Sequence, residues 1–202
     1  DEIVELAEDH DAMVMVDDCH GEGVLGGGKG IVAHFNLQGR VTVEGGSYSK
    51  ALGVQGGIIA GSEDLRNHAL NHSRSWLLSG SQPPGVAAAQ KASIEVLRDE
   101  PHHVQKLWDN TEYFRKELNS LGFDTGVSTT PIIHVMCGES RLAQELAGEL
   151  RKRGVMVGAI VFPMVARDKA RVRTQISSGL SKSDLDEVLI HFAEVGRRLG
   201  LI

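Results

Sequence analysis

The side chains best suited to chemistry in this sequence are a lysine and an acid that follow separate apolar segments. Lys50 lies in the glycine- and serine-rich stretch 45–53, and Asp17 directly follows the short apolar run 13–16. An acid at the end of one strand and a lysine in a loop after the next is an arrangement that holds pyridoxal phosphate. The lysine amine can form a Schiff base with the cofactor aldehyde, while the carboxylate keeps the pyridine nitrogen protonated and the ring electron-withdrawing.

Asp17 needs a partner if it is buried at a strand end, because desolvating an unpaired carboxylate is costly. A pyridinium N–H would be such a partner. The alternative is that Asp17 or Asp18 caps the following turn, and for an isolated aspartate the two interpretations have about equal weight. His20 follows shortly after in the sequence. It could return over the same site and donate a hydrogen bond to the phenolic oxygen of the cofactor, or relay a proton.

Two serines beside glycines form a second cluster, which also contains Lys50. Ser47 and Ser49 follow a pair of glycines, and hydroxyls next to free backbone N–H groups suit a phosphate. A flexible loop without a ligand is the alternative. Apolar residues follow Lys50, and a partly desolvated lysine is a competent nucleophile and base, which favours the functional interpretation.

Two arginines form a third cluster, in the stretch 170–177. Arg171 and Arg173 are two residues apart, so in a strand their side chains point to the same face. An arginine fork binds a substrate carboxylate with two hydrogen bonds, a geometry that lysine does not reproduce. Surface ion pairs are the alternative for these arginines.

The elements that must position these residues alternate between apolar strand-like runs and amphipathic helical runs, which is typical of an α/β fold. In the first half we expect the end of a helix at 1–10, strands at 13–17, 41–46 and 56–60, and helices at 62–71 and 84–98. In the second half we expect a long helix at 101–121, strands at 131–136, 155–157 and 170–177, and helices at 141–153 and 181–199. The expected domains are 1–100, a partial large cofactor-binding domain, and 101–202, a linking helix and a small C-terminal domain.

The composition limits the possible partners. Acidic residues (27) outnumber basic ones (21), and the net charge of −6 argues against binding to nucleic acid or to anionic membranes. No apolar run is long enough to cross a bilayer. The two cysteines, Cys19 and Cys137, are too few for a disulfide framework, so we expect reduced thiols in a cytoplasmic protein. No metal site is expected, because Cys19 and His20 lack a second ligand pair and His102 and His103 read as solvated.

Four stretches together resemble the α-oxoamine synthases, the fold-type I pyridoxal-phosphate enzymes that condense an amino acid with an acyl-CoA. The matching stretches are VDDCHGEGVLG (16–26), GSYSKALG (46–53) followed by Gly56 and Gly57, SGSQPP (79–84) and ARVRTQ (170–175). The resemblance covers nearly the whole chain. It implies the C-terminal part of a transferase large domain, with a mixed sheet and helices, followed by a smaller α/β domain.

The resemblance also implies a role for each matching residue. Asp17 would bind the pyridine nitrogen and His20 the phenolic oxygen, Lys50 would carry the Schiff base, and Ser47 would bind the phosphate. Arg173 would bind the substrate carboxylate. Ser79 would reach the cofactor phosphate of a neighbouring subunit, so the resemblance implies a homodimer with shared active sites.

Within this family, the stretches 171–175 and 196–202 favour the glycine C-acetyltransferase branch, which would join glycine and acetyl-CoA to a 2-amino-3-oxo acid and release CoA. Two alternatives stay open. One is an 8-amino-7-oxononanoate synthase, which uses alanine and a pimeloyl thioester. The other is a non-catalytic fragment or partner subunit, since the family extends further at its N-terminus and this chain is expected to lack part of the cofactor site.

Overall fold

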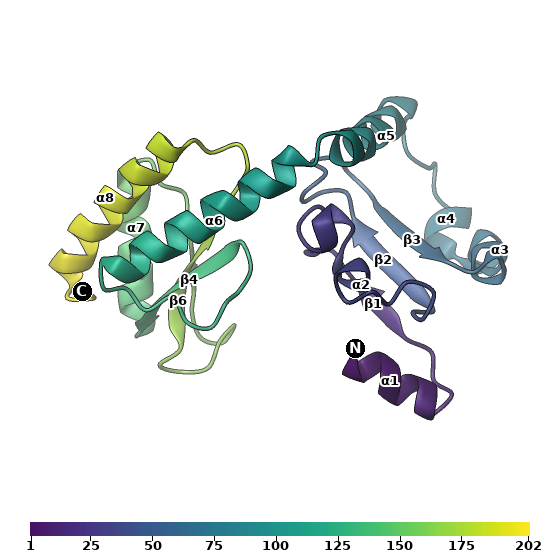
Figure 1. The fold of residues 1–202 in the computed structure, drawn as a ribbon, viewed down its shortest axis with the longest axis horizontal. Coiled ribbons are helices and arrows are strands. Elements are labelled where there is room, and N and C mark those ends of the chain that lie inside the picture. Colours follow the sequence, from purple (N-terminus) through teal and green to yellow (C-terminus); the bar gives the residue numbers. More distant parts are fainter. The chain divides into compact units, whose positions relative to one another are not determined.

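The structure is a computed structural model that describes all 202 residues, and it divides into two units, residues 1–104 and 105–202 (Figure 1). Three short strands form the sheet of the first unit. Strand β1 (Met15–Asp17) pairs in parallel with β2 (Val43–Ser47), and β2 pairs antiparallel with β3 (Gly57–Gly61). Asp17 lies opposite Gly45 in this ladder. The end of β1 therefore lies beside the strand that leads to Lys50.

Helices precede and follow these strands along the chain, and the longer ones lie where the sequence predicted helices. They are α1 (Glu2–Asp9), a 3-10 helix (Gly26–Gly28), α2 (Ile31–His34), α3 (Glu63–His72), α4 (Arg74–Leu77) and α5 (Pro84–Asp99). The hydroxyl of Ser62 accepts the Leu65 N–H and caps α3. Pro84 stands at the start of α5, where a missing N–H costs nothing.

The core of the first unit is small. Its buried cluster contains Val4, Val32 and Leu37. Helices α3, α4 and α5 bury no side chain completely. Several large apolar side chains of this unit are exposed, namely Ile58, Ile59, Trp76, Leu77 and Leu78.

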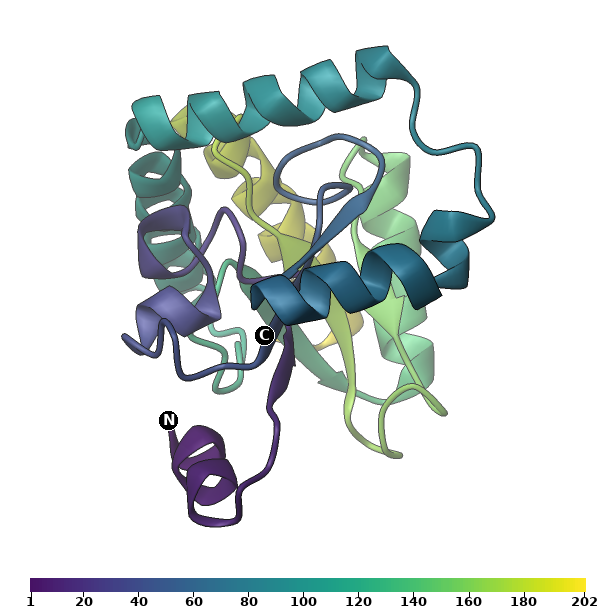
Figure 2. The same ribbon diagram turned by 90° about the vertical axis from the view of Figure 1, so that its right-hand side faces the viewer.

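The second unit has an antiparallel sheet with the strand order β4-β6-β5. Its elements are β4 (Ile132–Gly138), α7 (Ser140–Lys152), β5 (Gly158–Ile160), β6 (Ala170–Gln175) and α8 (Lys182–Leu199). Helix α6 (His102–Ser120) begins in the first unit and continues into the second. Figures 1 and 2 show α7 and α8 next to each other beside this sheet.

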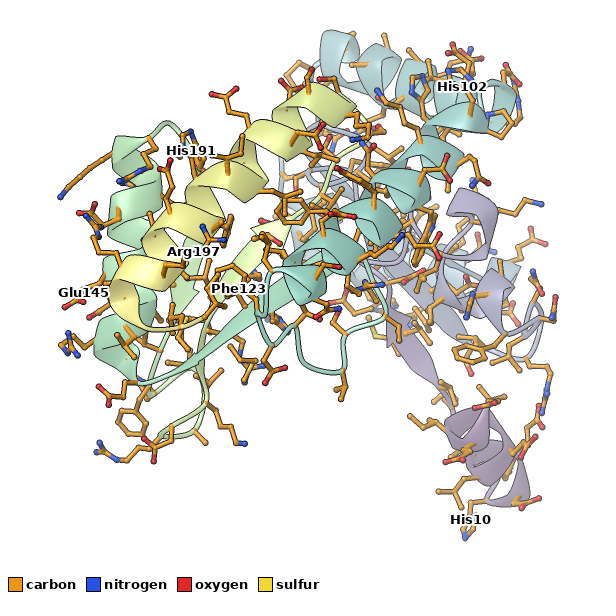
Figure 3. All side chains as sticks on the ribbon, turned by 60° about the vertical axis from the view of Figure 1, so that its left-hand side comes forward. His10, His102, Phe123, Glu145, His191 and Arg197 are labelled. Carbon is orange, nitrogen blue, oxygen red and sulfur yellow. The ribbon has the colours of Figure 1, made fainter.

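Alternate residues of β4 and β6 face the helices and fill a closed core. Ile133, Val135 and Val172 are completely buried. Phe192 of α8 makes edge-to-face contacts with Phe114 and with Phe123, which is labelled in Figure 3. Such aromatic pairs stabilise a core beyond the area they bury. The side chain of Ser181 caps α8 in a reciprocal capping box with Asp184.

The predicted mixed α/β class is confirmed, and one predicted strand is wrong in position. The sequence predicts a strand at 155–157, whereas β5 spans Gly158–Ile160. Val155 and Val157 instead pack against the core as partly buried side chains. The alternation of apolar residues at 155–157 therefore reflects the burial of these side chains and not the pairing of the backbone in a sheet. No helix of the structure has both the length and the apolar character that crossing a membrane requires.

Candidate functional site

Asp17 ends β1 with its side chain exposed. Its Oδ1 accepts the backbone N–H of Cys19 at 3.2 Å. Hydrogen bonding from the thiol and the backbone of Cys19 holds the pKa of Asp17 below its ordinary value, and the charges of Lys50 and His20 act in the same direction. Asp17 is therefore an ionised acid beside two basic side chains.

The Asp18 carboxylate binds the backbone at the start of α2. Its Oδ2 accepts the N–H of Ile31, the first residue of α2, at 2.7 Å. The carboxylate fills the space beside two glycines, since a Cβ built on Gly21 or Gly30 would lie 2.0 or 2.1 Å from its oxygens. Burial raises the pKa of Asp18. Both neighbouring acids therefore accept a backbone N–H, but Asp18 is half-buried and Asp17 stays exposed.

The loop that carries Lys50 is a tightly bonded connection between β2 and β3. Tyr48 is buried and anchors it: its N–H donates to Gly56 at 3.0 Å and its carbonyl accepts from Val54 at 2.8 Å. The Ser47 and Ser49 hydroxyls lie 2.8 Å apart. Two side chains of α5 also bind this loop, since Ser93 donates to the Leu52 carbonyl at 2.9 Å and Gln90 to the Gln55 carbonyl at 2.7 Å.

The structure brings Lys50 to the end of β1. The charge of Lys50 acts on the carboxylate of Asp17 and also on the thiol of Cys19, whose pKa is raised mainly by its hydrogen bond to Asp17. Lys50 is exposed and takes part in no ion pair that would neutralise it. The charges of the predicted amine and imidazole thus act on the predicted acid at the end of β1.

Glu22 is a residue of this site that the sequence did not reveal. Its Oε2 accepts the N–H of Ser47 at 3.1 Å. A Cβ on Gly46 would lie 1.8 Å from Glu22 Oε1, so the carboxylate fits only against a glycine. Burial raises the pKa of Glu22, and the carboxylate in turn adds to the raised pKa of Tyr48. No local pattern could have identified this contact, because its partners are 25 residues apart.

Ser79 has only local contacts in the chain. It is exposed, and its hydroxyl donates to the Trp76 carbonyl at 3.4 Å and accepts the Ser81 N–H at 3.3 Å. Neither bond links Ser79 to the Lys50 loop. Its predicted role toward a neighbouring subunit stays a prediction.

Arg173 lies on β6 in the second unit, opposite His134 of β4 and Gly158 of β5. Arg171 and Arg173 are half-buried and alternate with buried residues, so they share the sheet face away from the core, as predicted. Arg171 donates to the Lys169 carbonyl at 3.0 Å, whereas Arg173 forms no ion pair. Burial lowers the pKa of His134, and the two arginines add to this effect. Arg173 is therefore a free cation on a preformed strand.

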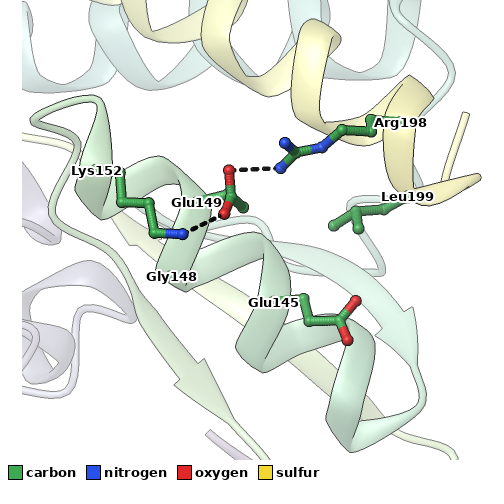
Figure 4. A pocket seen from close by; sticks show the side chains of 6 residues that line it. All are labelled: Glu145, Gly148, Glu149, Lys152, Arg198 and Leu199. Carbon is green, nitrogen blue, oxygen red and sulfur yellow. Dashed lines mark hydrogen bonds and ion pairs between the residues drawn. The ribbon is translucent and has the colours of Figure 1, made fainter.

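A hollow of about 360 Å³ lies elsewhere in the second unit, between α7 and α8. Figure 4 shows Glu149 at its centre, bound by Lys152 at 2.7 Å and by Arg198 at 2.6 Å. These bonds lower the pKa of Glu149 to about 2. None of the predicted site residues lines this hollow, and its charges are already paired. It is a structural ion-pair cluster and not the candidate site.

The donors at the ends of β1 and β2 fit pyridoxal phosphate chemically. Lys50 provides an unpaired primary amine for an aldehyde, and Asp17 an ionised acid for a ring nitrogen. Ser47 and Ser49 provide two neighbouring hydroxyls for a phosphate, whereas the backbone N–H of Ser47 is already bound by Glu22.

Comparison with known proteins agrees with this chemistry. The chain is 51% identical over its 202 residues to an 8-amino-7-oxononanoate synthase of Symbiobacterium thermophilum and 47% identical to one of Thermosipho melanesiensis. It covers 52% of each of these proteins, so it spans about half the length of the curated relatives it matches. A solved structure of Sphingomonas wittichii serine palmitoyltransferase superposes with a TM-score of 0.94 at 26% identity, over 100% of this chain and 51% of that one.

The family model of the class I and II aminotransferases matches residues 1–192. That model spans both units of the structure, including the ends of β1 and β2 and the strand that carries Arg173. The enzymes of this family depend on pyridoxal phosphate. The chain belongs to the aminotransferase class I and II family of pyridoxal-phosphate-dependent enzymes.

Proposed function

We propose that this chain is the part of a pyridoxal-phosphate-dependent acyltransferase that carries the lysine and the acid of the cofactor site. The enzyme would condense an amino acid with an acyl thioester, as expected for an α-oxoamine synthase. The observation that carries the proposal is the position of Lys50 beside Asp17, where the charge of the amine acts on the carboxylate.

Each predicted residue of the cofactor site would make one contact with the cofactor. Asp17 would hold a proton on the pyridine nitrogen, and its lowered pKa keeps it ionised for that purpose. His20 would donate a hydrogen bond to the phenolic oxygen, and Ser47 would bind the phosphate. When bound, the cofactor supplies an electron-withdrawing ring that stabilises negative charge on the α-carbon of the substrate.

Lys50 and Arg173 would act on the substrate. The Lys50 amine would hold the cofactor through its aldehyde and, when free, would take the proton from the α-carbon of the substrate. Arg173 would bind the substrate carboxylate with its free guanidinium and so orient the α-carbon for this transfer. The α-carbon would then attack the acyl carbonyl, the carbon–sulfur bond would break and the thiol would leave. Formation of 8-amino-7-oxononanoate from alanine would also release the carboxylate of the amino acid as CO2.

The relatives favour alanine and a pimeloyl thioester as substrates, the reaction of an 8-amino-7-oxononanoate synthase, over glycine and acetyl-CoA. The matching relatives bear that name, and the preference for a glycine C-acetyltransferase finds no support. Of the two stretches that suggested it, 171–175 and 196–202, the second contributes to packing: Gly196 lies against Phe123, and Leu201 and Ile202 pack on the core.

We further propose a cytoplasmic homodimer in which Ser79 serves the active site of the partner. Support comes from the first unit, where Ser79 is exposed next to the exposed apolar side chains of Trp76, Leu77 and Leu78. Such a patch favours contact with another protein surface.

The test is a titration of the chain with pyridoxal phosphate, in which a bound cofactor gives a yellow absorbance. Lys50→Ala should abolish this absorbance. Lys29→Ala is the matched control, because Lys29 is also an exposed lysine of the same unit, and it should leave the absorbance intact. An unaltered chain that never becomes yellow would contradict the proposal and favour the non-catalytic alternative.

A further inference from the structure

Three potential metal ligands meet where α5 ends and α6 begins. They are Glu100, His102 and His103, and their donor atoms all lie within 4.8 Å of one another. Glu100 Oε2 is 3.2 Å from His103 Nε2 and 3.7 Å from His102 Nε2. Figure 3 labels His102 at this junction. All three residues belong to the first unit.

We propose that these three side chains form a binding site for a divalent transition-metal ion such as Ni²⁺ or Zn²⁺. Two imidazoles and one carboxylate suit these ions, whereas Mg²⁺ and Ca²⁺ prefer oxygen ligands alone. A tetrahedral ion with bonds of about 2.0–2.1 Å places neighbouring ligand atoms about 3.3 Å apart. The two distances from Glu100 lie on either side of that value, so small side-chain rotations would complete the geometry.

The charges around Glu100 leave its carboxylate available. Its only ion-pair partners are the two histidines, and no lysine or arginine binds it. Arg98, the basic residue in the last turn of α5, is held by the neighbouring Asp99 through two hydrogen bonds of 2.7 and 2.8 Å. The nearest cation in the sequence is thus already neutralised and does not compete for Glu100.

The backbone between the ligands is already ordered. Pro101 fixes one backbone dihedral between Glu100 and His102, and the N–H of His103 donates to the Glu100 carbonyl at 3.2 Å. The rings of His102 and His103 have centroids 4.2 Å apart. The backbone that carries the ligands therefore needs no reordering when an ion binds, and only the side chains have to be fixed. All three side chains are exposed, so water can complete the coordination.

A second histidine pair in the same unit provides the comparison. His68 and His72 lie one turn apart on α3, with stacked rings whose centroids are 4.5 Å apart. This pair can also offer two nitrogens to an ion, but no carboxylate completes the group. We therefore expect it to bind the same ion more weakly.

The experiment uses the chain without an affinity tag and Ni²⁺ as the probe, with calorimetry for affinity and amide NMR spectra for location. His103→Ala and His102→Ala should each weaken the tightest Ni²⁺ site at least tenfold, and Glu100→Gln by a smaller factor. The double variant His68→Ala/His72→Ala should leave that site unchanged. Ni²⁺ is paramagnetic, so the amide signals of residues 99, 100 and 102–104 should broaden first.

Three results would overturn the inference. They are the absence of measurable Ni²⁺ binding, broadening centred on residues 68–72, and unchanged affinity in both His102→Ala and His103→Ala. All the substituted side chains are exposed, so the variants should keep their fold. Unchanged circular dichroism spectra would verify this and link any loss of affinity to the missing ligand.

Discussion

The carboxylate of Glu22 accepts the backbone N–H of Ser47, with Oε2 3.1 Å from the nitrogen. This bond connects the turn that carries His20 to the end of β2, three residues before Lys50. It therefore fixes the distance between the two segments that form the candidate site, independently of any ligand.

Removing the Glu22 carboxylate should loosen the Lys50 loop. In Glu22→Ala the Ser47 N–H loses its acceptor, which costs about 1–3 kcal/mol when the donor is left without a partner. The Ser47 amide should then exchange with solvent faster. Glu22→Gln retains an acceptor oxygen and should preserve most of the protection. Equal exchange rates in Glu22→Ala and the unaltered chain, measured by hydrogen exchange, would show that the bond does not hold the loop.

Substitution of the two adjacent aspartates should affect stability to different extents. Asp18→Ala removes the acceptor of the Ile31 N–H and should lower the free energy of unfolding by about 1–2 kcal/mol, the usual effect of losing a helix cap. Asp17→Ala should change it by less than about 0.5 kcal/mol, because the side chain is exposed.

Binding of pyridoxal phosphate should give the reverse order for these variants. Asp17→Ala should weaken binding strongly, since no other acid can hold the proton on the ring nitrogen. Asp18→Asn keeps an acceptor oxygen and should bind the cofactor nearly as well as the unaltered chain. Urea denaturation and absorbance titration together measure both quantities, and a stronger loss of cofactor in Asp18→Asn would reverse the assignment of the two acids.

Arg173 should matter more for the amino acid substrate than its neighbour on the same face. Arg173→Lys removes the fork that can bind a carboxylate twice, so KM for the amino acid should rise at least tenfold while KM for the acyl thioester changes little. Arg171 donates to the Lys169 carbonyl, and Arg171→Lys is the matched control. Steady-state kinetics of the enzyme would contradict the assignment if both variants raised both KM values equally.

Glu149 should make the stability of the second unit depend on acid pH. Its pKa is about 2 in the folded chain against an ordinary value of 4.5. The ionised carboxylate is the stabilising form, so its contribution is complete above pH 4.5 and is lost as the pH falls toward 2. The difference in unfolding free energy between the unaltered chain and Glu149→Gln should shrink over this interval.

The matched control for Glu149 lines the same hollow. Glu145 pairs with Arg141 alone, at 2.8 Å, whereas Glu149 binds three basic side chains. Glu145→Gln should therefore have the smaller effect on stability. Denaturation curves recorded at several pH values would refute the prediction if the difference for Glu149→Gln did not change with pH.

The sequence predicted well those features that are governed by nearby residues. The period of apolar residues located α5, α7 and α8, and the two-residue spacing of Arg171 and Arg173 correctly placed both on one face of β6. The helices α2 and α4 were missed because each is only four residues long. So short a segment shows no helical period.

Features that depend on distant contacts could not be predicted. The sequence left open whether Asp17 or Asp18 caps the turn, and in the structure both accept a backbone N–H, Asp17 from Cys19 and Asp18 from the distant Ile31. The role of Glu22 depends on Gly46 and Ser47, far along the chain. Strand β5 was displaced because Val155 and Val157 are as apolar as strand residues but pack beside the ladder.

The position of the Asp18 carboxylate also affects which residues positions 21 and 30 can hold. Its oxygens lie where a Cβ on either glycine would have to go. A larger residue at position 21 would therefore force the Asp18 side chain to move, and this movement would disturb its bond to the Ile31 N–H. The identity of one residue in the turn thus depends on a hydrogen bond made by another.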